Sequence, residues 1–357
     1  MLGSNCPAAF GSLARHLSST KQPRLLNALR QLSSQSKLYP RCFPLPHLSN
    51  SSQIGGGGFS DVYVASLDDR KVAVKKMRVF GETETEIEML EQAFSKEAIT
   101  WRQLSHPNVL PFYGLFKDGV KPCLVSPWME NGHIRKFLNT RREAYGTDQL
   151  LSLILDIALG LEYLHEQKII HADLKSDNIL VTPALKACIA DFGLSKVAST
   201  LSSMGNLSRP YGTTAVHYKA PELHEGEKAD SRSDIYSLAC LIYEILMGEP
   251  PFLHLPSESA VIYKVMNGQR PECPPSGCRS EIGEVNALWR LVKACWAQSP
   301  DERPTAAQVV QALKGTGIRA QETEPAWNWD PAPTSRFRRQ LEVARPLPSL
   351  SKLRTMV

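Results

Sequence analysis

Apolar side chains recur along the chain at two different spacings, and each spacing predicts one kind of element. Alternating positions over 62–64 and again over 71–75 predict two strands. Asp68 and Asp69 lie between these strands and suit the turn of a hairpin. Elsewhere the patterns predict helices over 87–104 and 150–167 and a further strand over 187–190. Strand-like and helix-like segments therefore alternate through the middle of the chain.

Composition divides the chain into three regions. Residues 1–50 form a basic, Ser-rich extension, and the first acidic residue of the chain is Asp61. Leucines at helical spacing predict a short amphipathic helix in this extension, at Leu25, Leu26, Leu29 and Leu32. Residues 51–315 carry the alternating segments and are predicted to form the folded domain. Frequent prolines predict a mostly disordered C-terminal tail over 316–357.

The N-terminal extension permits two interpretations. An acid-free segment rich in Ser and Arg resembles a mitochondrial presequence, and residues 15–19 resemble a cleavage site. The alternative, which we favour, is a flexible or helical extension that packs on the domain or docks a partner. We therefore expect a cytoplasmic protein, with a mitochondrial location as the alternative.

Overall composition excludes several classes of protein. Hydrophobic residues make up 42% and charged residues 22% of the chain, as is usual for a soluble globular protein. No apolar run approaches the ~18 residues of a membrane-spanning helix. The net charge is +5, but six basic residues within 1–60 leave −1 for the remainder, so a nucleic-acid-binding surface is not predicted either. The eight cysteines lack paired metal-ligand spacing, which favours reduced thiols.

A glycine-rich segment is the first motif that carries chemistry. It runs Ile54-Gly55-Gly56-Gly57-Gly58-Phe59-Ser60-Asp61-Val62-Tyr63. Glycines let backbone N–H groups approach phosphates that a Cβ would keep away. A bare glycine run is as often a linker, but here a predicted strand follows at once and a second strand follows one hairpin later. The segment is therefore interpreted as a phosphate-binding loop.

Lys75 closes the apolar strand that follows this loop. An unpaired ammonium at that position would be costly, so Lys75 requires an anion. Phosphates are one candidate partner, and the carboxylate of Glu97, on the helix predicted over 87–104, is the other. Either residue alone would be an ordinary surface residue; their order and spacing after the glycine-rich loop favour the functional interpretation.

A second group of polar residues follows the helix predicted over 150–167. Asp173 can accept the hydrogen of a substrate hydroxyl, and Lys175 can neutralise a phosphoryl group as it moves. Asn178 and Asp191 supply the hard oxygen ligands that Mg²⁺ prefers. Each pattern is weak in isolation, but in this order after Lys75 they together indicate phosphoryl transfer.

These motifs together resemble a eukaryotic protein kinase domain over 51–315. The resemblance continues through Ala220-Pro221-Glu222 and through residues 233–237 and 295–304. It implies an α+β bilobal fold, with a small antiparallel-sheet N-lobe that has one main helix, a larger and mainly helical C-lobe, and ATP and Mg²⁺ between them. The lysine at position 175, within Asp173-Leu174-Lys175, resembles the pattern of the serine/threonine kinases. Residues 124–132 resemble the tyrosine-kinase-like group, of which fungal genomes carry many members.

The resemblance also implies roles around the nucleotide. Adenine would bond to the backbone of Pro127 and Met129 beside a gatekeeper, Ser126, and His133 falls where a ribose contact is usual. The implied ATP-binding residues are Ile54, Gly55, Gly56, Gly57, Gly58, Phe59, Ser60, Val62, Ala73, Lys75, Ser126, Pro127, Met129 and Leu180. Two structural roles are implied as well: a buried ion pair between Glu222 and Arg303, and Asp234 bracing the backbone of the catalytic loop.

Three departures from the family pattern matter. Ser60 replaces the third glycine of the loop. Ala172 replaces the arginine that in such kinases precedes the catalytic aspartate, here Asp173, and binds a phosphorylated residue. We therefore expect activity that does not require phosphorylation of the activation segment, which runs from Asp191 to Glu222. The segment from Gly212 to Lys219 is two residues longer than usual. The threonine that normally bonds the catalytic aspartate and lysine could therefore be Thr213 or Thr214, or neither.

We expect an active serine/threonine protein kinase that acts on protein substrates in signal transduction. The alternative from another class is a pseudokinase or scaffold that binds nucleotide and partners with little turnover. The intact set of Lys75, Glu97, Asp173, Asn178 and Asp191 favours the enzyme. Tyrosine or dual-specificity transfer is disfavoured by Lys175. Neither the substrate nor the oligomeric state follows from the sequence.

Overall fold

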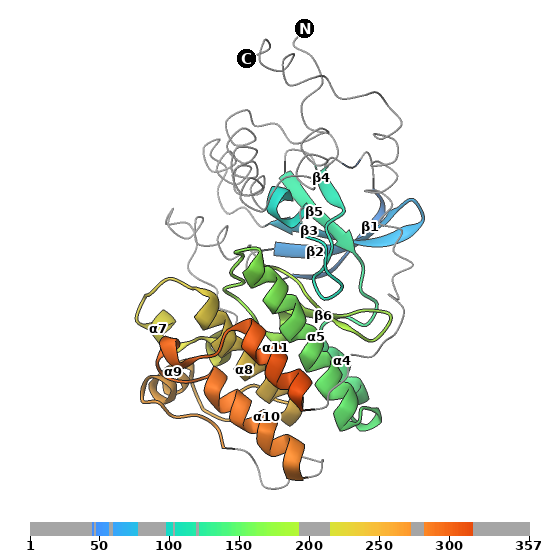
Figure 1. Ribbon diagram of the computed structural model, residues 1–357. Coiled ribbons are helices and arrows are strands. Elements are labelled where there is room, and N and C mark those ends of the chain that lie inside the picture. Colours follow the sequence, from blue (N-terminus) through green and yellow to red (C-terminus); the bar gives the residue numbers. More distant parts are fainter. Residues whose placement is uncertain are drawn as a thin grey trace, which may run out of the picture.

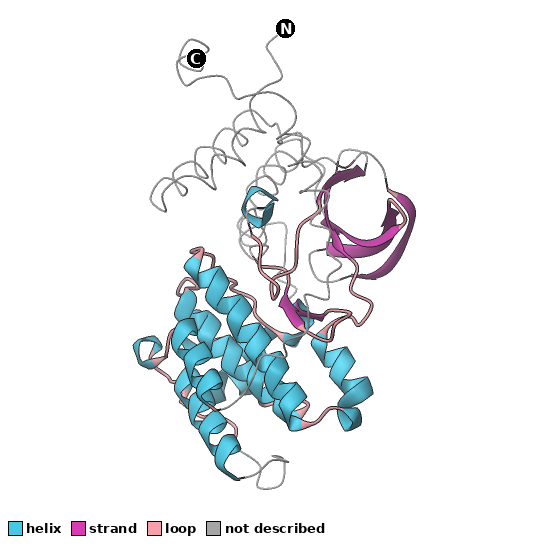
Figure 2. Ribbon diagram, turned by 45° about the vertical axis from the view of Figure 1, so that its right-hand side comes forward, coloured by secondary structure: helices cyan, strands magenta, loops and turns pink. Residues whose placement is uncertain are grey.

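The computed structural model describes residues 45, 48–56, 60–77, 98–102, 104–118, 121–192, 215–272 and 282–316, and these form two lobes (Figure 1). One lobe is a five-stranded antiparallel sheet in the order β1-β2-β3-β5-β4. Its strands are β1 (Ser49–Gly56), β2 (Ser60–Leu67), β3 (Arg70–Met77), β4 (Gly114–Asp118) and β5 (Lys121–Pro127). Figure 2 shows this sheet set apart from the helices of the second lobe, with a two-stranded hairpin between them. The predicted α+β bilobal fold is thereby confirmed.

The hairpin predicted from the sequence is present in the sheet. Strands β2 and β3 pair antiparallel, with Leu67 opposite Arg70, and Asp68 and Asp69 form the two-residue turn. Both turn residues have positive φ angles, 46° and 62°, as the tight hairpin turns that match strand twist require. Strand β1 begins at Ser49, two residues before the predicted start of the domain.

The second lobe is mainly helical. Its α-helices are α4 (Ile134–Arg141), α5 (Thr147–Glu166), α7 (Pro221–His224), α8 (Ser231–Met247), α9 (Glu258–Met266), α10 (Ile282–Cys295) and α11 (Ala306–Gly315). Short 3₁₀ turns lie at Arg142–Ala144, Ser176–Asn178, Ala215–Tyr218 and Pro300–Glu302, and β6 (Ile179–Val181) pairs with β7 (Ala187–Ile189). Helix α5 and strand β7 match the helix and strand predicted over 150–167 and 187–190.

Part of the predicted secondary structure falls outside the described residues. These are the extension helix, the C-terminal tail and residues 87–97 of the predicted helix over 87–104. Residues 98–102 are helical, whereas Leu104 is not, so the helix ends before the predicted last residue.

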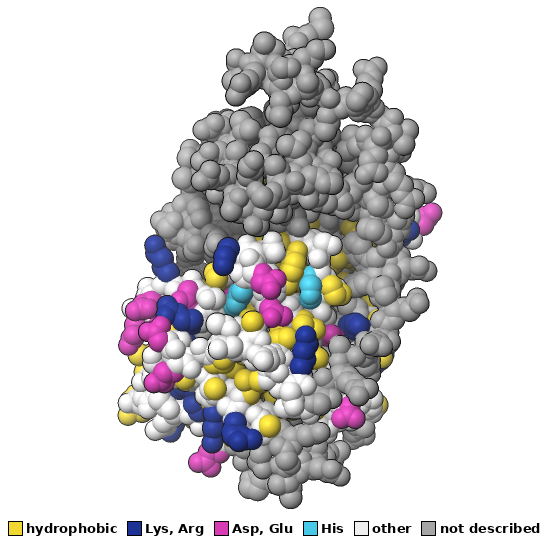
Figure 3. All heavy atoms as spheres, in the orientation of Figure 1, with side chains coloured by type: hydrophobic (Ala, Val, Ile, Leu, Met, Phe, Trp, Pro, Cys, Tyr) yellow, Lys and Arg dark blue, Asp and Glu magenta, His cyan; other side chains and the backbone are white. Residues whose placement is uncertain are grey.

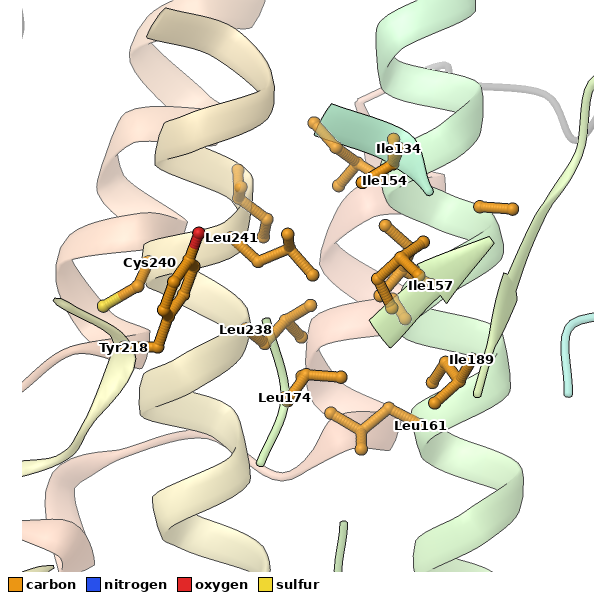
Figure 4. Close-up of a cluster of buried hydrophobic side chains, with 14 of the residues drawn as sticks. Ile134, Ile154, Ile157, Leu161, Leu174, Ile189, Tyr218, Leu238, Cys240 and Leu241 are labelled. Atoms are coloured by element: carbon orange, nitrogen blue, oxygen red, sulfur yellow. The ribbon is translucent and has the colours of Figure 1, made fainter. Parts of the chain in front are cut away.

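The core of the helical lobe lies between α5 and α8. Ile157 and Leu161 of α5 and Leu238 and Leu241 of α8 project toward one another, and all four side chains are fully buried (Figure 4). Each such side chain contributes about 1.5–3 kcal/mol by leaving water. Cys240 is buried in the same cluster.

Helix α5 is also pressed against the segment that leads into the sheet. At Gly160 an added Cβ would lie 2.5 Å from the carbonyl oxygen of Asn108, so only glycine allows this approach. Beside this contact the backbones of Asn108 and Leu110 hydrogen-bond to Ile189 in β7, at 2.9 and 2.8 Å. The sheet lobe is therefore tied to the strand that precedes Asp191.

The surface of the helical lobe is mixed in charge. On the face in Figure 3, Lys and Arg side chains are interspersed with Asp and Glu side chains. In the described part of the chain, every helix is too short or too polar to span a lipid bilayer.

A buried carboxylate in α5 predicts a pH dependence of stability. Asp156 accepts a hydrogen bond from the Ala187 N–H at 3.0 Å, and burial raises its pKa from 3.8 to about 6. A group whose pKa is raised by folding stabilises the fold below its unfolded pKa, and this stability is lost as the pH rises through the folded pKa. Asp156→Asn keeps an acceptor for Ala187 and removes the titration. We expect the free energy of unfolding of the variant, relative to the parent, to increase by ~2 kcal/mol from about pH 4 to about pH 7. Denaturant titrations across this window measure it, and a constant difference would contradict the assignment.

Candidate active site

One buried carboxylate, that of Asp234, fixes the backbone of the loop between α5 and β6 by hydrogen bonds. Asp234, in the first turn of α8, has 1% of its surface exposed. Its Oδ2 accepts a hydrogen bond from the His171 N–H at 2.8 Å and lies 2.9 Å from Nε2 of His165; its Oδ1 accepts from the Ala172 N–H at 2.8 Å. The predicted role of Asp234 in bracing this backbone is confirmed.

These bonds hold an unusual backbone conformation. Ala172 has φ +64°, in the left-handed region that non-glycine residues rarely enter. The neighbouring His171 is fully buried, and its Nδ1 accepts from the Asp173 N–H at 3.2 Å while Nε2 lies 3.0 Å from the Ala190 carbonyl oxygen. Two hydrogen bonds to Asp234 and one to Nδ1 of His171 fix the loop backbone on both sides of Ala172. These bonds keep Ala172 in its strained conformation.

Three of the predicted site residues meet on this loop. Nζ of Lys175 donates to Oδ2 of Asp173 at 2.8 Å. Nδ2 of Asn178 donates to the Asp173 carbonyl oxygen at 2.7 Å and to its Oδ2 at 3.1 Å. Both hydrogen bonds use the amide nitrogen of Asn178, so its Oδ1 is the atom that could bind a cation. The Asp173 side chain is 42% exposed and remains accessible.

Two further site residues form an ion pair between the lobes. Nζ of Lys75 in β3 lies 2.6 Å from Oδ2 of Asp191, which follows β7. Desolvation of the Asp191 carboxylate raises its pKa, but the charge of Lys75, its hydrogen bond to the carboxylate and the charge of Lys175 outweigh it and hold the pKa below its usual value. Asp191 is therefore ionised at neutral pH, as a ligand for a divalent cation must be.

An aromatic stack lies behind Asp191. Phe192 is buried against the indole of Trp101 in an edge-to-face contact, with 5.5 Å between ring centroids, and Trp101 stacks on Phe112 at 5.1 Å. The Trp101 Nε1–H donates to the carbonyl oxygen of Leu110. Trp101 carries no motif of its own. It stands four positions after Glu97 in the helix predicted over 87–104, and this spacing, which is typical of residues that share a helix face, was the available signal in the sequence.

Four of the nucleotide-binding residues predicted on the sheet share one face of it. Val62 pairs with Lys75 across β2 and β3, and Ala73 pairs with Ser126 across β3 and β5. Opposite residues of antiparallel strands point to the same face, so these four side chains line it together.

The remaining predicted residues divide into described and undescribed ones. Ile54, Gly55 and Gly56 end β1, Ser60 begins β2, Pro127 ends β5, Met129 follows it, and Leu180 lies in β6. Gly57, Gly58, Phe59, Glu97, Thr213 and Thr214 lie outside the described residues.

A buried polar network centred on Tyr218 connects α4, α8 and the 3₁₀ turns at 176–178 and 215–218. No sequence motif had linked these four elements. The Tyr218 hydroxyl accepts from Arg135 of α4 at 2.8 Å, donates to Glu244 of α8, and lies 3.2 Å from Oγ of Ser176. Nε of Arg135 also donates to Glu244 at 2.7 Å. The residue after Lys175 is therefore tied to the segment that precedes Ala220-Pro221-Glu222.

The predicted ion pair between Glu222 and Arg303 is confirmed. NH1 and NH2 of Arg303 donate to the two carboxylate oxygens at 2.6 and 2.8 Å, and the Arg303 side chain is fully buried. The guanidinium also lies 5.1 Å from the centre of the Tyr236 ring. A bidentate pair of this kind fixes orientation as well as distance.

Comparison with known proteins places this site in a family. Residues 48–313 match the family described as protein tyrosine and serine/threonine kinase. The serine/threonine/tyrosine-protein kinase HT1 of Arabidopsis thaliana is 31% identical over 273 residues, which cover 76% of this chain and 66% of that protein. The serine/threonine-protein kinase STY17 of the same plant is 29% identical over 292 residues (78% and 48%). The dual specificity protein kinase pyk3 of Dictyostelium discoideum is 30% identical over 262 residues (73% and 18%). The chain thus spans less than two thirds of each relative.

The family match covers most of the chain, so the fold and the site define a protein kinase. The chain belongs to the eukaryotic protein kinase family, as its motifs predicted. A family that unites tyrosine and serine/threonine kinases also agrees with the predicted resemblance to the tyrosine-kinase-like group.

The Tyr218 network predicts a difference between two tyrosines. Tyr218→Phe removes the hydroxyl and leaves buried Glu244 with one partner fewer, so we expect the free energy of unfolding to fall by about 1–3 kcal/mol. Tyr263→Phe in α9 is the matched control, because that side chain is 66% exposed and should tolerate the same change. Urea denaturation of both variants measures the difference. Equal stabilities of the two would show that the network contributes nothing.

Proposed function

We propose that this protein transfers the γ-phosphate of ATP to serine or threonine hydroxyls of protein substrates. The observation that carries the proposal is the convergence of Asp173, Lys175 and Asn178 in one braced loop, beside Asp191, which Lys75 of the sheet lobe pairs with and whose pKa the charge of Lys175 lowers. Phosphoryl transfer requires mainly positioning and charge neutralisation, and this arrangement supplies both.

Each residue has a part in this proposal. Asp173 orients the substrate hydroxyl and accepts its hydrogen, because its carboxylate is accessible and held by Lys175 and Asn178. Lys175 neutralises charge on the phosphoryl group, and Lys75 holds the phosphates of ATP.

The amide oxygen of Asn178 and the carboxylate of Asp191 are the proposed ligands of Mg²⁺, since both are hard oxygen donors and Asp191 is ionised. Bound Mg²⁺ would neutralise phosphate charge.

Serine and threonine are the proposed acceptors because Lys175 stands where the family's serine/threonine members carry lysine. The names of two relatives include tyrosine or dual specificity, so tyrosine transfer is the second candidate. The pseudokinase alternative is less well supported, since the described members of the catalytic set lie together rather than apart.

The proposal predicts which amino acids are phosphorylated. Incubation with radiolabelled Mg-ATP and a mixed peptide library should produce phosphoserine and phosphothreonine on acid hydrolysis. Lys75→Met should lower transfer by at least about tenfold with little change in thermal stability. Lys71→Met on the same strand is the control, because that side chain is 62% exposed. Phosphotyrosine as the main product would favour the second candidate. Equal transfer by the parent and Lys75→Met would exclude the assigned role of Lys75.

The division of roles between two aspartates predicts two different defects. Asp191→Asn should weaken Mg²⁺-dependent nucleotide binding, because it removes the charge that holds the cation. Asp173→Asn should leave that affinity unchanged and depress turnover, because Asp173 acts on the hydroxyl in the transition state. Fluorescent-nucleotide titration and initial rates separate the two effects. Identical losses of nucleotide affinity in both variants would contradict this division.

A further inference from the structure

The residues just before β1 contact the far edge of the sheet. The Leu45 N–H donates to the carbonyl oxygen of Leu115 at 2.7 Å. Leu115 lies in β4, the edge strand of the sheet, at the opposite end of the strand order from β1. An edge strand leaves backbone groups unpaired, and Leu45 satisfies one of them.

The same residues cover a small apolar cluster. On the sheet face opposite Lys75, five side chains are at most 6% exposed: Ala65, Val72, Val74, Cys123 and Val125. Leu45 and Leu48 pack against this cluster and are themselves partly buried. Tyr63, Leu67, Tyr113 and Phe116 pack against the same cluster, and Leu45 and Leu48 add to this cover from outside the sheet.

The local sequence suits this contact. Pro44 and Pro46 flank Leu45, so Leu45 is the one residue of the three that has a backbone N–H to donate. A residue that precedes proline also favours extended backbone, which is the conformation that pairs with a strand edge. The hydrogen bond to Leu115 uses that single donor.

The covered cluster is connected to the active site through β3. Val72 and Val74 point to the covered face, and Ala73 and Lys75, which alternate with them, point to the opposite face. Anything that fixes the two valines therefore fixes the lysine that pairs with Asp191.

We propose that Leu45 and Leu48 form a strap that belongs to the sheet lobe and positions Lys75 for ATP. The strap covers the sheet face opposite Lys75 and hydrogen-bonds to the edge strand β4. The end of the N-terminal extension therefore contributes to the nucleotide site. Leu45 and Leu48 are positioning residues, since they act through β3 and do not contact substrate. The effect on ATP rests on the proposed function, whereas the packing of the strap does not.

The test compares leucine variants in the full chain. Leu45→Ala combined with Leu48→Ala removes the strap's apolar surface; Leu45→Met combined with Leu48→Met retains it. Leu185→Ala combined with Leu253→Ala is the matched control, because these leucines are 42% and 46% exposed. Native proteins are treated with N-ethylmaleimide, and the modification rate of each cysteine is followed by peptide mass spectrometry. The KM values for Mg-ATP and for an acceptor peptide are measured in parallel.

Cys123 is the reporter, and Cys240 and Cys295 in the helical lobe are internal standards, since all three are at most 1% exposed. In the alanine variant we expect Cys123 to react about tenfold faster and the two standards to react at the parent rate. The KM for Mg-ATP should rise about threefold or more with the peptide KM unchanged. The methionine variant and the exposed-leucine control should resemble the parent.

Three results would overturn the inference. An unchanged Cys123 rate would show that the strap does not close the sheet face. A parallel rise at Cys240 and Cys295 would show general destabilisation instead of a local role. A faster Cys123 with an unchanged KM for Mg-ATP would show that the strap does not position Lys75. If the parent transferred no phosphate, the proposed function would fail, and the Cys123 rates would still decide whether the strap exists.

Discussion

The buried carboxylate of Asp234 is the interaction on which the rest of the site depends. It receives hydrogen bonds from two consecutive backbone N–H groups of the catalytic loop and lies beside His165. A buried charge is stable only when hydrogen-bonded, and here its partners are the groups whose positions matter. The loop can therefore hold Ala172 at a left-handed φ and present Asp173 outward. The hydrogen bonds to Asp234 offset the free-energy cost of burying its carboxylate, and they also fix the loop.

Two further contacts join the sheet lobe to the residues that follow β7, beside this loop. The first is electrostatic: Lys75 of the sheet pairs with Asp191, which follows β7. The second is steric: Phe192 packs against Trp101, at the end of the helix that follows β3. The site therefore forms where a strand of one lobe, a helix end and a braced loop meet. On the outer face of the same sheet, Leu45 and Leu48 extend this dependence to residues that precede the first strand.

The elements that depend mainly on neighbouring residues could be predicted from the sequence. The turn at Asp68 and Asp69, helix α5 and strand β7 follow from spacing and turn chemistry, whereas the ion pair of Glu222 with Arg303 and the role of Asp234 were implied by the family resemblance. Contacts between distant residues of ordinary type were not predicted. Arg135 and Glu244 are 109 positions apart, Ser176 and Tyr218 are 42 apart, and no spacing rule links them. The contacts of Leu45 and Leu48 agree with an extension that packs on the domain, but no pattern in the sequence distinguished these two leucines. The domain boundaries and the cytoplasmic location stay predictions.

The most direct test of this account is the turnover of Asp234→Asn. Asparagine has one acceptor oxygen and a donor amide, so it must lose a bond to His171 or Ala172 and set two N–H groups against each other. The account predicts that the turnover number falls by at least about tenfold while Mg-nucleotide affinity stays within about twofold. Asp156→Asn, at another buried aspartate, should retain turnover. Parent-level turnover in Asp234→Asn, measured at saturating Mg-ATP and peptide, would contradict the dependence of catalysis on this carboxylate.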